Sequence, residues 1–197
     1  MSDLSRRAFL AAAGTGIGAA WLAARPEDVA GAHAHADAAR RASERGEAPP
    51  PLEVLTPEQA ADVEAVAAQV IPTDDLPGAR EAHVIHYVDS SLATWAADQR
   101  QPFLESLDRF NATVARRHPG RSRFAELTSE QQVRLLRASE RDWFFRQVRT
   151  MTVIGMFANP SWGGNFEGAG WRVLGFEPRY VWQPPFGEYD ADAQRGS

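Results

Sequence analysis

Two helix-initiation signals in the chain constrain its fold more than any other feature. Thr56 with Gln59, and Thr128 with Gln131, have the spacing of a capping box, in which two side chains satisfy free amides at the start of a helix. Apolar residues then recur at intervals of three and four, the period of a helix with one buried face. No segment shows the alternation of a half-buried strand. We therefore predict a mostly α fold, an irregular bundle of four to five helices with a glycine- and tryptophan-rich C-terminal loop region.

The apolar spacing gives the expected extent of each helix. The first begins at Pro57, which suits the first helical position, and ends before Pro72. The second is expected over 79–95, the third over 101–117, and the fourth, a long helix, over roughly 128–157. The residues expected on the buried faces are Val63, Val66, Ala67, Val70, Ile71, Ala82, Ile85, Val88, Leu92, Phe103, Leu107, Phe110, Val114, Val133, Leu136 and Phe144.

Residues 155–187 differ in composition from the rest of the chain. They hold seven of the 15 glycines, three of the six tryptophans and eight of the 19 aromatic residues. Glycine at this density permits positive φ angles and close backbone approach, which predicts an ordered, turn-rich loop and then a short segment around 171–174. No G-x-G-x-x-G pattern is present, and the absence of lysine from the chain excludes a P-loop. We interpret the segment as a scaffold or as a surface that contacts a protein partner.

The N-terminal region has the organisation of an export signal. The residues that match the twin-arginine signal are Ser5, Arg6, Arg7, Phe9 and Leu10. Residues 8–24 carry no charge, and small-x-small sites at 32–34 and 34–36 suit signal peptidase. The alternative is a weak N-terminal membrane anchor, but 8–24 is at the lower limit of length for a spanning helix and contains three glycines.

These features divide the chain into four expected parts. Residues 1–36 are a twin-arginine-type signal peptide, which sends an already folded protein to the periplasm. Residues 37–54 are a flexible, solvated linker rich in alanine, arginine, glutamate and proline. Residues 55–187 form the helical domain, and 188–197 form a tail.

Composition excludes several classes of function. The chain has no cysteine, which rules out disulfides, thiolate metal centres, covalently attached haem and a thiol nucleophile. Its net charge of −5 argues against a nucleic-acid partner. His83 and His86, three residues apart and close to carboxylates, leave open a free-standing periplasmic helical protein that binds a metal or small ligand. No motif assembles a catalytic set, so we assign neither catalytic nor metal-binding residues.

Arginines also recur at approximately helical spacing along the fourth expected helix. They are Arg134, Arg137, Arg141, Arg146 and Arg149. Glu130 stands four residues before the first of them, in the favourable order for an ion pair on a helix. The common interpretation of such a row is a solvated helix face. The alternative is a surface for an acidic partner, because guanidinium groups pair well with carboxylates.

Two blocks of sequence carry a family resemblance. The first consists of Ile71-Pro72-Thr73-Asp74, Pro77-Gly78-Ala79-Arg80-Glu81-Ala82 and Tyr87-Val88-Asp89. The second consists of Gly155-Met156-Phe157, Asn159-Pro160, Trp162-Gly163-Gly164-Asn165, Gly170-Trp171 and Leu174-Gly175-Phe176. With the twin-arginine leader, these blocks resemble the gluconate 2-dehydrogenase subunit 3 family.

The resemblance implies a non-catalytic small subunit of a periplasmic sugar or alcohol dehydrogenase. Its catalytic partner would be an FAD flavoprotein of the glucose–methanol–choline type, often joined by a membrane-tethered multihaem cytochrome c, so FAD and haem c would lie in other chains. The small subunit would be read by the twin-arginine translocation machinery and would help the flavoprotein to mature. The residues then expected to contact the flavoprotein are Trp162, Gly163, Gly164, Asn165, Gly170, Trp171, Gly175 and Phe176.

Overall fold

A computed structural model of the chain describes residues 51–179 and a set of separate positions between Glu27 and Arg45. The leader residues Ser5–Leu10 and the tail 188–197 lie outside the described residues. Among the residues that are described, no helix is both long and apolar enough to cross a membrane.

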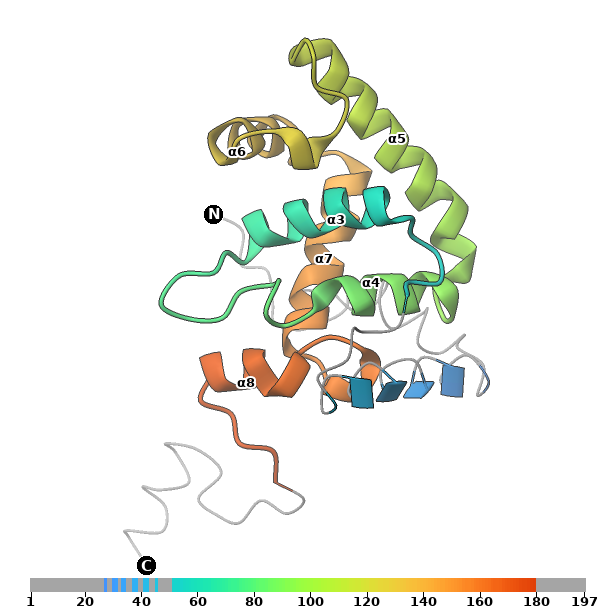
Figure 1. Cartoon of the computed structure of the whole chain (residues 1–197), viewed down its shortest axis with the longest axis vertical. Coiled ribbons are helices and arrows are strands. Elements are labelled where there is room, and N and C mark those ends of the chain that lie inside the picture. Colours follow the sequence, from blue (N-terminus) through green and yellow to red (C-terminus); the bar gives the residue numbers. More distant parts are fainter. Residues whose placement is uncertain are drawn as a thin grey trace, which may run out of the picture.

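Residues 51–179 contain helices and turns and no strand (Figure 1). The α-helices are α3 (Pro57–Val70), α4 (Val84–Ala93), α5 (Arg100–Arg117), α6 (Ser129–Ala138), α7 (Trp143–Phe157) and α8 (Ala169–Val173). Short 3₁₀ helices connect them: η1 (Ala97–Gln99), η2 (Phe124–Glu126), η3 (Pro160–Trp162) and η4 (Phe166–Gly168). The mostly α class is confirmed.

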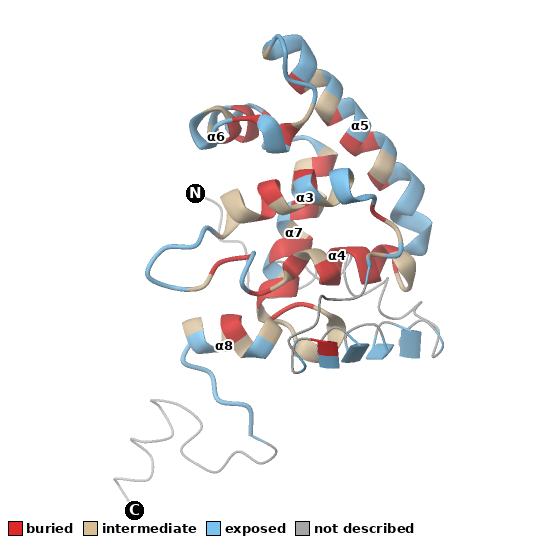
Figure 2. Ribbon diagram, viewed as in Figure 1, coloured by how far each residue is buried: buried red, intermediate tan, exposed pale blue. Residues whose placement is uncertain are grey.

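Helix α7 is the centre of the bundle. Helices α3 and α4 both cross it and contact it, and α5 packs against the same core (Figure 1). The buried residues line the sides of α3, α4 and α7 that face one another, whereas much of α5 is exposed (Figure 2). On α5 the predicted stripe is confirmed, because Phe103, Leu107, Phe110 and Val114 are all buried.

Both capping boxes form as predicted. The backbone N–H of Gln59 donates to Thr56 Oγ1 at 3.3 Å, and the N–H of Thr56 donates to Gln59 Oε1 at 3.0 Å. At the start of α6, Thr128 and Gln131 make the same two bonds, at 3.4 and 3.0 Å. Each box satisfies two amides that the helix itself leaves free.

Two helix boundaries differ from the prediction. The second helix begins at Val84 and not at 79, because His83 has a left-handed backbone conformation with φ of 51°. The expected long fourth helix is two helices, separated at 139–142, and α6 and α7 run in different directions (Figure 1). Ser139 and Asp142 stand at the two cap positions of that break, where short polar side chains are favoured over helix interiors.

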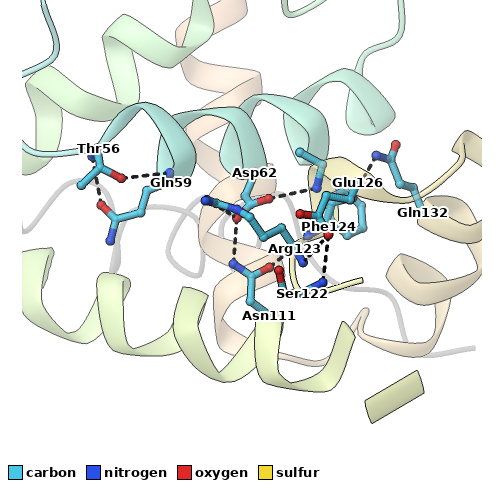
Figure 3. A network of polar contacts seen from close by, with 10 residues as sticks. Thr56, Gln59, Asp62, Asn111, Ser122, Arg123, Phe124, Glu126 and Gln132 are labelled. Carbon is cyan, nitrogen blue, oxygen red and sulfur yellow. Dashed lines mark hydrogen bonds and ion pairs between the residues drawn. The ribbon is translucent and has the colours of Figure 1, made fainter. Parts of the chain in front are cut away.

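A buried carboxylate joins three elements of the bundle (Figure 3). Asp62 on α3 is fully buried and accepts hydrogen bonds from Asn111 Nδ2 at 2.7 Å, Arg123 Nη2 at 3.1 Å and the N–H of Ala125 at 2.9 Å. A buried charge needs this degree of compensation to be tolerated. Asp62 therefore holds α3, α5 and η2 together.

A second buried carboxylate fixes the chain that enters the bundle. Asp89 on α4 is fully buried and accepts the backbone N–H groups of Glu53, Val54 and Leu55 at 2.7, 3.0 and 2.8 Å. The expected linker ended at Val54, but its last two residues, Glu53 and Val54, are bonded to Asp89 and so belong to the folded part. The linker interpretation did not foresee these bonds because the anchoring group is 34 residues further along the chain.

Candidate partner-binding site

The described part of the glycine-rich segment folds back on the end of α7. It makes η3, η4 and the short helix α8, which lie beside the C-terminal end of α7 (Figure 1). Gly163, Asn165 and Gly168, which cap or precede these turns, have positive φ angles of 98°, 47° and 69°. Such angles are accessible to glycine and tolerated by asparagine, which explains the composition of the segment.

Asn165 is the anchor of this region. It is fully buried, its Nδ2 donates to the carbonyl of Ala158 at 2.7 Å, and its Oδ1 accepts the N–H of Gly170 at 2.8 Å. The single amide therefore connects the end of α7 to the beginning of α8. Loss of such a side chain would leave buried backbone groups without partners, which is more destabilising than loss of an exposed hydrogen bond.

Two glycines allow the backbone of this segment to approach the backbone of α7 closely beside Asn165. A Cβ atom at Gly164 would collide with the carbonyl of Gly155 on α7, and a Cβ atom at Gly170 would collide with the carbonyl of Met156. Trp171 completes the contact, because its Nε1 donates to the carbonyl of Phe157 at 3.0 Å. We call the contacts of Gly164, Asn165, Gly170 and Trp171 with the end of α7 the C-terminal joint.

His83, the N-cap residue of α4, packs against this region. The ring of His83 stacks on Phe166 at 4.2 Å, and the N–H of Phe166 donates to the carbonyl of Ala82 at 3.1 Å. Burial lowers the pKa of His83, an effect that the charges of Glu64, Glu167 and Glu81 oppose. His86 is 7% exposed. Within the described part of the chain, no group of three histidine or acidic side chains is arranged to hold a metal ion.

The first sequence block also forms an internal structure. The carboxylate of Glu81 accepts Thr73 Oγ1 at 2.6 Å and the N–H of Gly78 at 2.9 Å, and these bonds, that from Thr73 foremost, lower its pKa. The N–H of Ala79 donates to the carbonyl of Ile71 at 2.9 Å. A Cβ atom at Gly78 would collide with the backbone of Pro72 and Thr73. The block therefore closes the loop between α3 and α4 on itself.

The structure separates the eight expected partner-contact residues by environment. Gly164, Asn165 and Gly170 are buried within the joint, whereas Trp162, Gly163 and Trp171 are half-buried, and Gly175 and Phe176 are exposed. Whether a residue of the segment is buried depends on whether it packs against the backbone of α7, so composition alone does not predict it. His33, from the N-terminal region, contacts the Trp162 ring edge-on at 4.6 Å between centroids.

An exposed apolar end follows α8. Leu174 is 62% exposed and Phe176 is 41% exposed. Phe176 is held in place, because its N–H donates to the carbonyl of Trp171 at 2.8 Å and its ring contacts the Trp171 ring at 5.4 Å. We call residues 174–176 the exposed end. Leu174 was not among the expected contact residues, although its place directly before a glycine at a helix end could have indicated it.

Comparison with known proteins identifies the family of the chain. A family model described as Gluconate 2-dehydrogenase subunit 3 matches residues 57–178. No curated protein and no solved structure matches the chain. The matched range extends from the first residue of α3 to Pro178, within the glycine-rich segment, and it includes both blocks described above. The chain belongs to the gluconate 2-dehydrogenase subunit 3 family.

Proposed function

We propose that this chain is the non-catalytic small subunit of a periplasmic, FAD-dependent sugar or alcohol dehydrogenase whose catalytic subunit is of the glucose–methanol–choline type. The family match over 57–178 is the observation that carries the proposal, since the family is named for one subunit of gluconate 2-dehydrogenase. FAD would lie in the catalytic subunit, and haem c in a third, cytochrome subunit.

The leader supports a role in export. Twin-arginine signals serve proteins that fold before they are translocated. A flavoprotein must bind FAD before it leaves the cytoplasm, so a partner that supplies this signal would bring the loaded enzyme to the periplasm. Arg6 and Arg7 are the residues that the translocation machinery would read.

The exposed end supports a contact with the catalytic subunit. The buried residues of the joint contact their own chain, whereas Leu174 is 62% exposed and Phe176 is 41% exposed, so a partner that contacts these two side chains would not disturb the joint. Large apolar and aromatic side chains dominate the energetics of many interfaces. The joint would act indirectly by fixing the position of this end.

Co-expression with the catalytic flavoprotein tests the proposal. Arg6→Lys with Arg7→Lys should abolish periplasmic FAD-linked dehydrogenase activity while the flavoprotein accumulates in the cytoplasm. Arg40→Lys with Arg41→Lys, a pair outside the signal, is the matched control and should leave the activity unchanged. Normal periplasmic activity with both leader arginines replaced would contradict the export role.

A further inference from the structure

Residues of the C-terminal end of α3, of α6 and of the first half of α7 line a pocket of about 250 Å³. These parts of the three helices lie at the end of the bundle away from α8 (Figure 1). The apolar wall of the pocket includes Val70, Leu136 and Phe145, and Arg137 and Arg149 line it as well. We call this the α3–α6–α7 groove.

A hydrogen bond between two glutamine side chains connects α3 and α6 beside the groove. Gln69 Nε2 on α3 donates to Gln132 Oε1 on α6 at 2.8 Å, and Gln132 Nε2 donates to the carbonyl of Phe124 at 3.2 Å. Gln132 is itself buried. The two helices that frame the groove are therefore held at a set separation, which lowers the ordering cost of binding.

Two arginines of the groove form no ion pair with the described residues. Arg137 and Arg149 are exposed, and within the described residues neither has a carboxylate at ion-pair distance. Arg134, on the same helix as Arg137, differs from them because it pairs with Glu130 at 3.3 Å. Glu140 also lines the groove and is the only acidic side chain among its described lining residues.

The face extends along α7 beyond the groove. Phe145, Arg149 and Val153 follow at intervals of four residues, so they lie along one side of the helix. Val153 is 43% exposed, so it adds an apolar side chain to this face. Residues 129–153 contain five arginines against three acidic residues in a chain whose net charge is −5.

We propose that the α3–α6–α7 groove and the adjoining face of α7 bind an acidic segment of the catalytic flavoprotein subunit. Carboxylates of that segment would pair with Arg137 and Arg149, because guanidinium groups match carboxylates in two-point contacts. One apolar side chain of the segment would enter against Leu136 and Phe145. The extension to Val153 favours a polypeptide over a small anion, which would need only the arginines.

This inference rests on the proposed role as a subunit, but not on the exposed end after α8. The groove and the exposed end belong to different elements and can be altered independently. The chain would then contact the complex at two sites, one mainly apolar and one mainly ionic, and only the ionic contact should weaken at high salt.

Charge reversal in the full chain, co-expressed with the catalytic flavoprotein, provides the first test. Arg137→Glu with Arg149→Glu should weaken association by roughly tenfold or more and reduce its dependence on salt. Arg116→Glu with Arg121→Glu makes the same change of charge at exposed positions outside the groove and should have little effect. Circular dichroism should show unchanged helicity for both variants. Equal affinity and equal salt dependence in the two variants would overturn the inference.

Cross-linking identifies the occupant. A photoreactive amino acid at Val153 in the assembled complex should form a cross-link to an acidic segment of the catalytic flavoprotein, and replacing those acids by lysine should restore binding to the Arg137→Glu, Arg149→Glu variant. A cross-link to residues 180–197, to a second copy of this chain or to a non-acidic segment would overturn the inference. If the unaltered chain fails to associate with the flavoprotein, the proposed function itself is wrong. If the chain associates and the arginine substitutions do not change its affinity, only the role of the groove is wrong.

Discussion

The C-terminal joint and the exposed end come from one glycine-rich segment, yet they have opposite environments. In the joint, Asn165 is fully buried and Gly170 lies against the backbone of α7. Only a few residues later, Leu174 is 62% exposed, and a Cβ atom at Gly175 would meet no other atom within 4 Å. Glycine is required at Gly170 because another backbone is close, and it is favoured at Gly175 only because φ is 65°.

This difference shows that the sequence blocks of the family combine two kinds of residue. Residues such as Asn165 and Gly170 preserve the position of α8, and their replacement should unfold or loosen the subunit. Leu174 and Phe176, in contrast, present exposed apolar surface at the end of the segment, and Phe176 also contacts the Trp171 ring. Four measurements on the isolated subunit separate these roles, ordered by the size of the expected effect on its stability.

The largest loss of stability is expected for Gly170→Ala. The added methyl group would overlap the carbonyl of Met156, so α8 must move away from α7. We expect a decrease of about 3 kcal/mol or more in the free energy of unfolding. Gly175→Ala is the matched control and should lower it by only about 1 kcal/mol, the effect of a positive φ in open space. Urea denaturation measures both, and equal losses would show that the joint is not tightly packed.

Asn165→Ala should have the next largest effect. It removes the two hydrogen bonds that connect Ala158 and Gly170, and it places alanine at a φ of 47°. We expect about 2–3 kcal/mol of destabilisation. Asn159→Ala is the control, because the exposed Asn159 makes one cap bond to the N–H of Ser161, and its loss should be about 1 kcal/mol or less. A loss no greater than that of the control would contradict the anchoring role of Asn165.

The double variant Leu174→Ser, Phe176→Ser should lower stability by only about 1–2 kcal/mol, because Leu174 is 62% exposed, and the main loss is the contact of the 41% exposed Phe176 ring with Trp171. Its effect should appear in co-purification with the catalytic flavoprotein, which we expect to decrease by roughly tenfold. Thermal unfolding and pull-down of the same preparation measure the two quantities. Undiminished co-purification would remove the exposed end from the interface, while a large loss of stability would assign these residues to the fold.

The smallest effect concerns pH. Burial lowers the pKa of His83, so near its ordinary value of about 6.5 the unfolded chain binds more protons than the folded chain. Stability should therefore rise as pH increases through this range and decrease as pH falls from about 7.5 to 5.5. His83→Asn keeps a residue that tolerates the left-handed conformation and should flatten this dependence. An unchanged slope in the variant would show that His83 does not contribute to it.

The helices were predictable where local signals were sufficient. The two capping boxes and the apolar stripe of α5 are local features, and the structure has them as expected. The division of the expected fourth helix at 139–142 was not predicted, because Leu136 and Phe144 are eight residues apart, a spacing that an uninterrupted helix would also place on one face. Helix α6 packs against α3, whereas α7 packs mainly against α3 and α4, and the chain turns between them at Ser139 and Asp142, short polar residues that favour helix ends.

The site was predictable only as a region. Its glycines, tryptophans and Asn165 indicated an ordered loop near the C-terminal end, and this much follows from backbone preference. Which residues face α7 and which face solvent could not be read from the same pattern, since Gly164 and Gly175 are identical residues in opposite environments. The twin-arginine signal remains a prediction, because Arg6 and Arg7 lie outside the described residues.

The sequence by itself determined the helical class, the helix starts at Thr56 and Thr128 and the family, because each depends on local hydrogen bonding or on residue order. The tertiary structure alone decided the pairing of Asp62 with η2 and of Asp89 with 53–55, since these groups are far apart along the chain. It also decided which glycines are essential, because that depends on how closely a second backbone approaches. Local preferences create the elements, and long-range packing gives each residue its role.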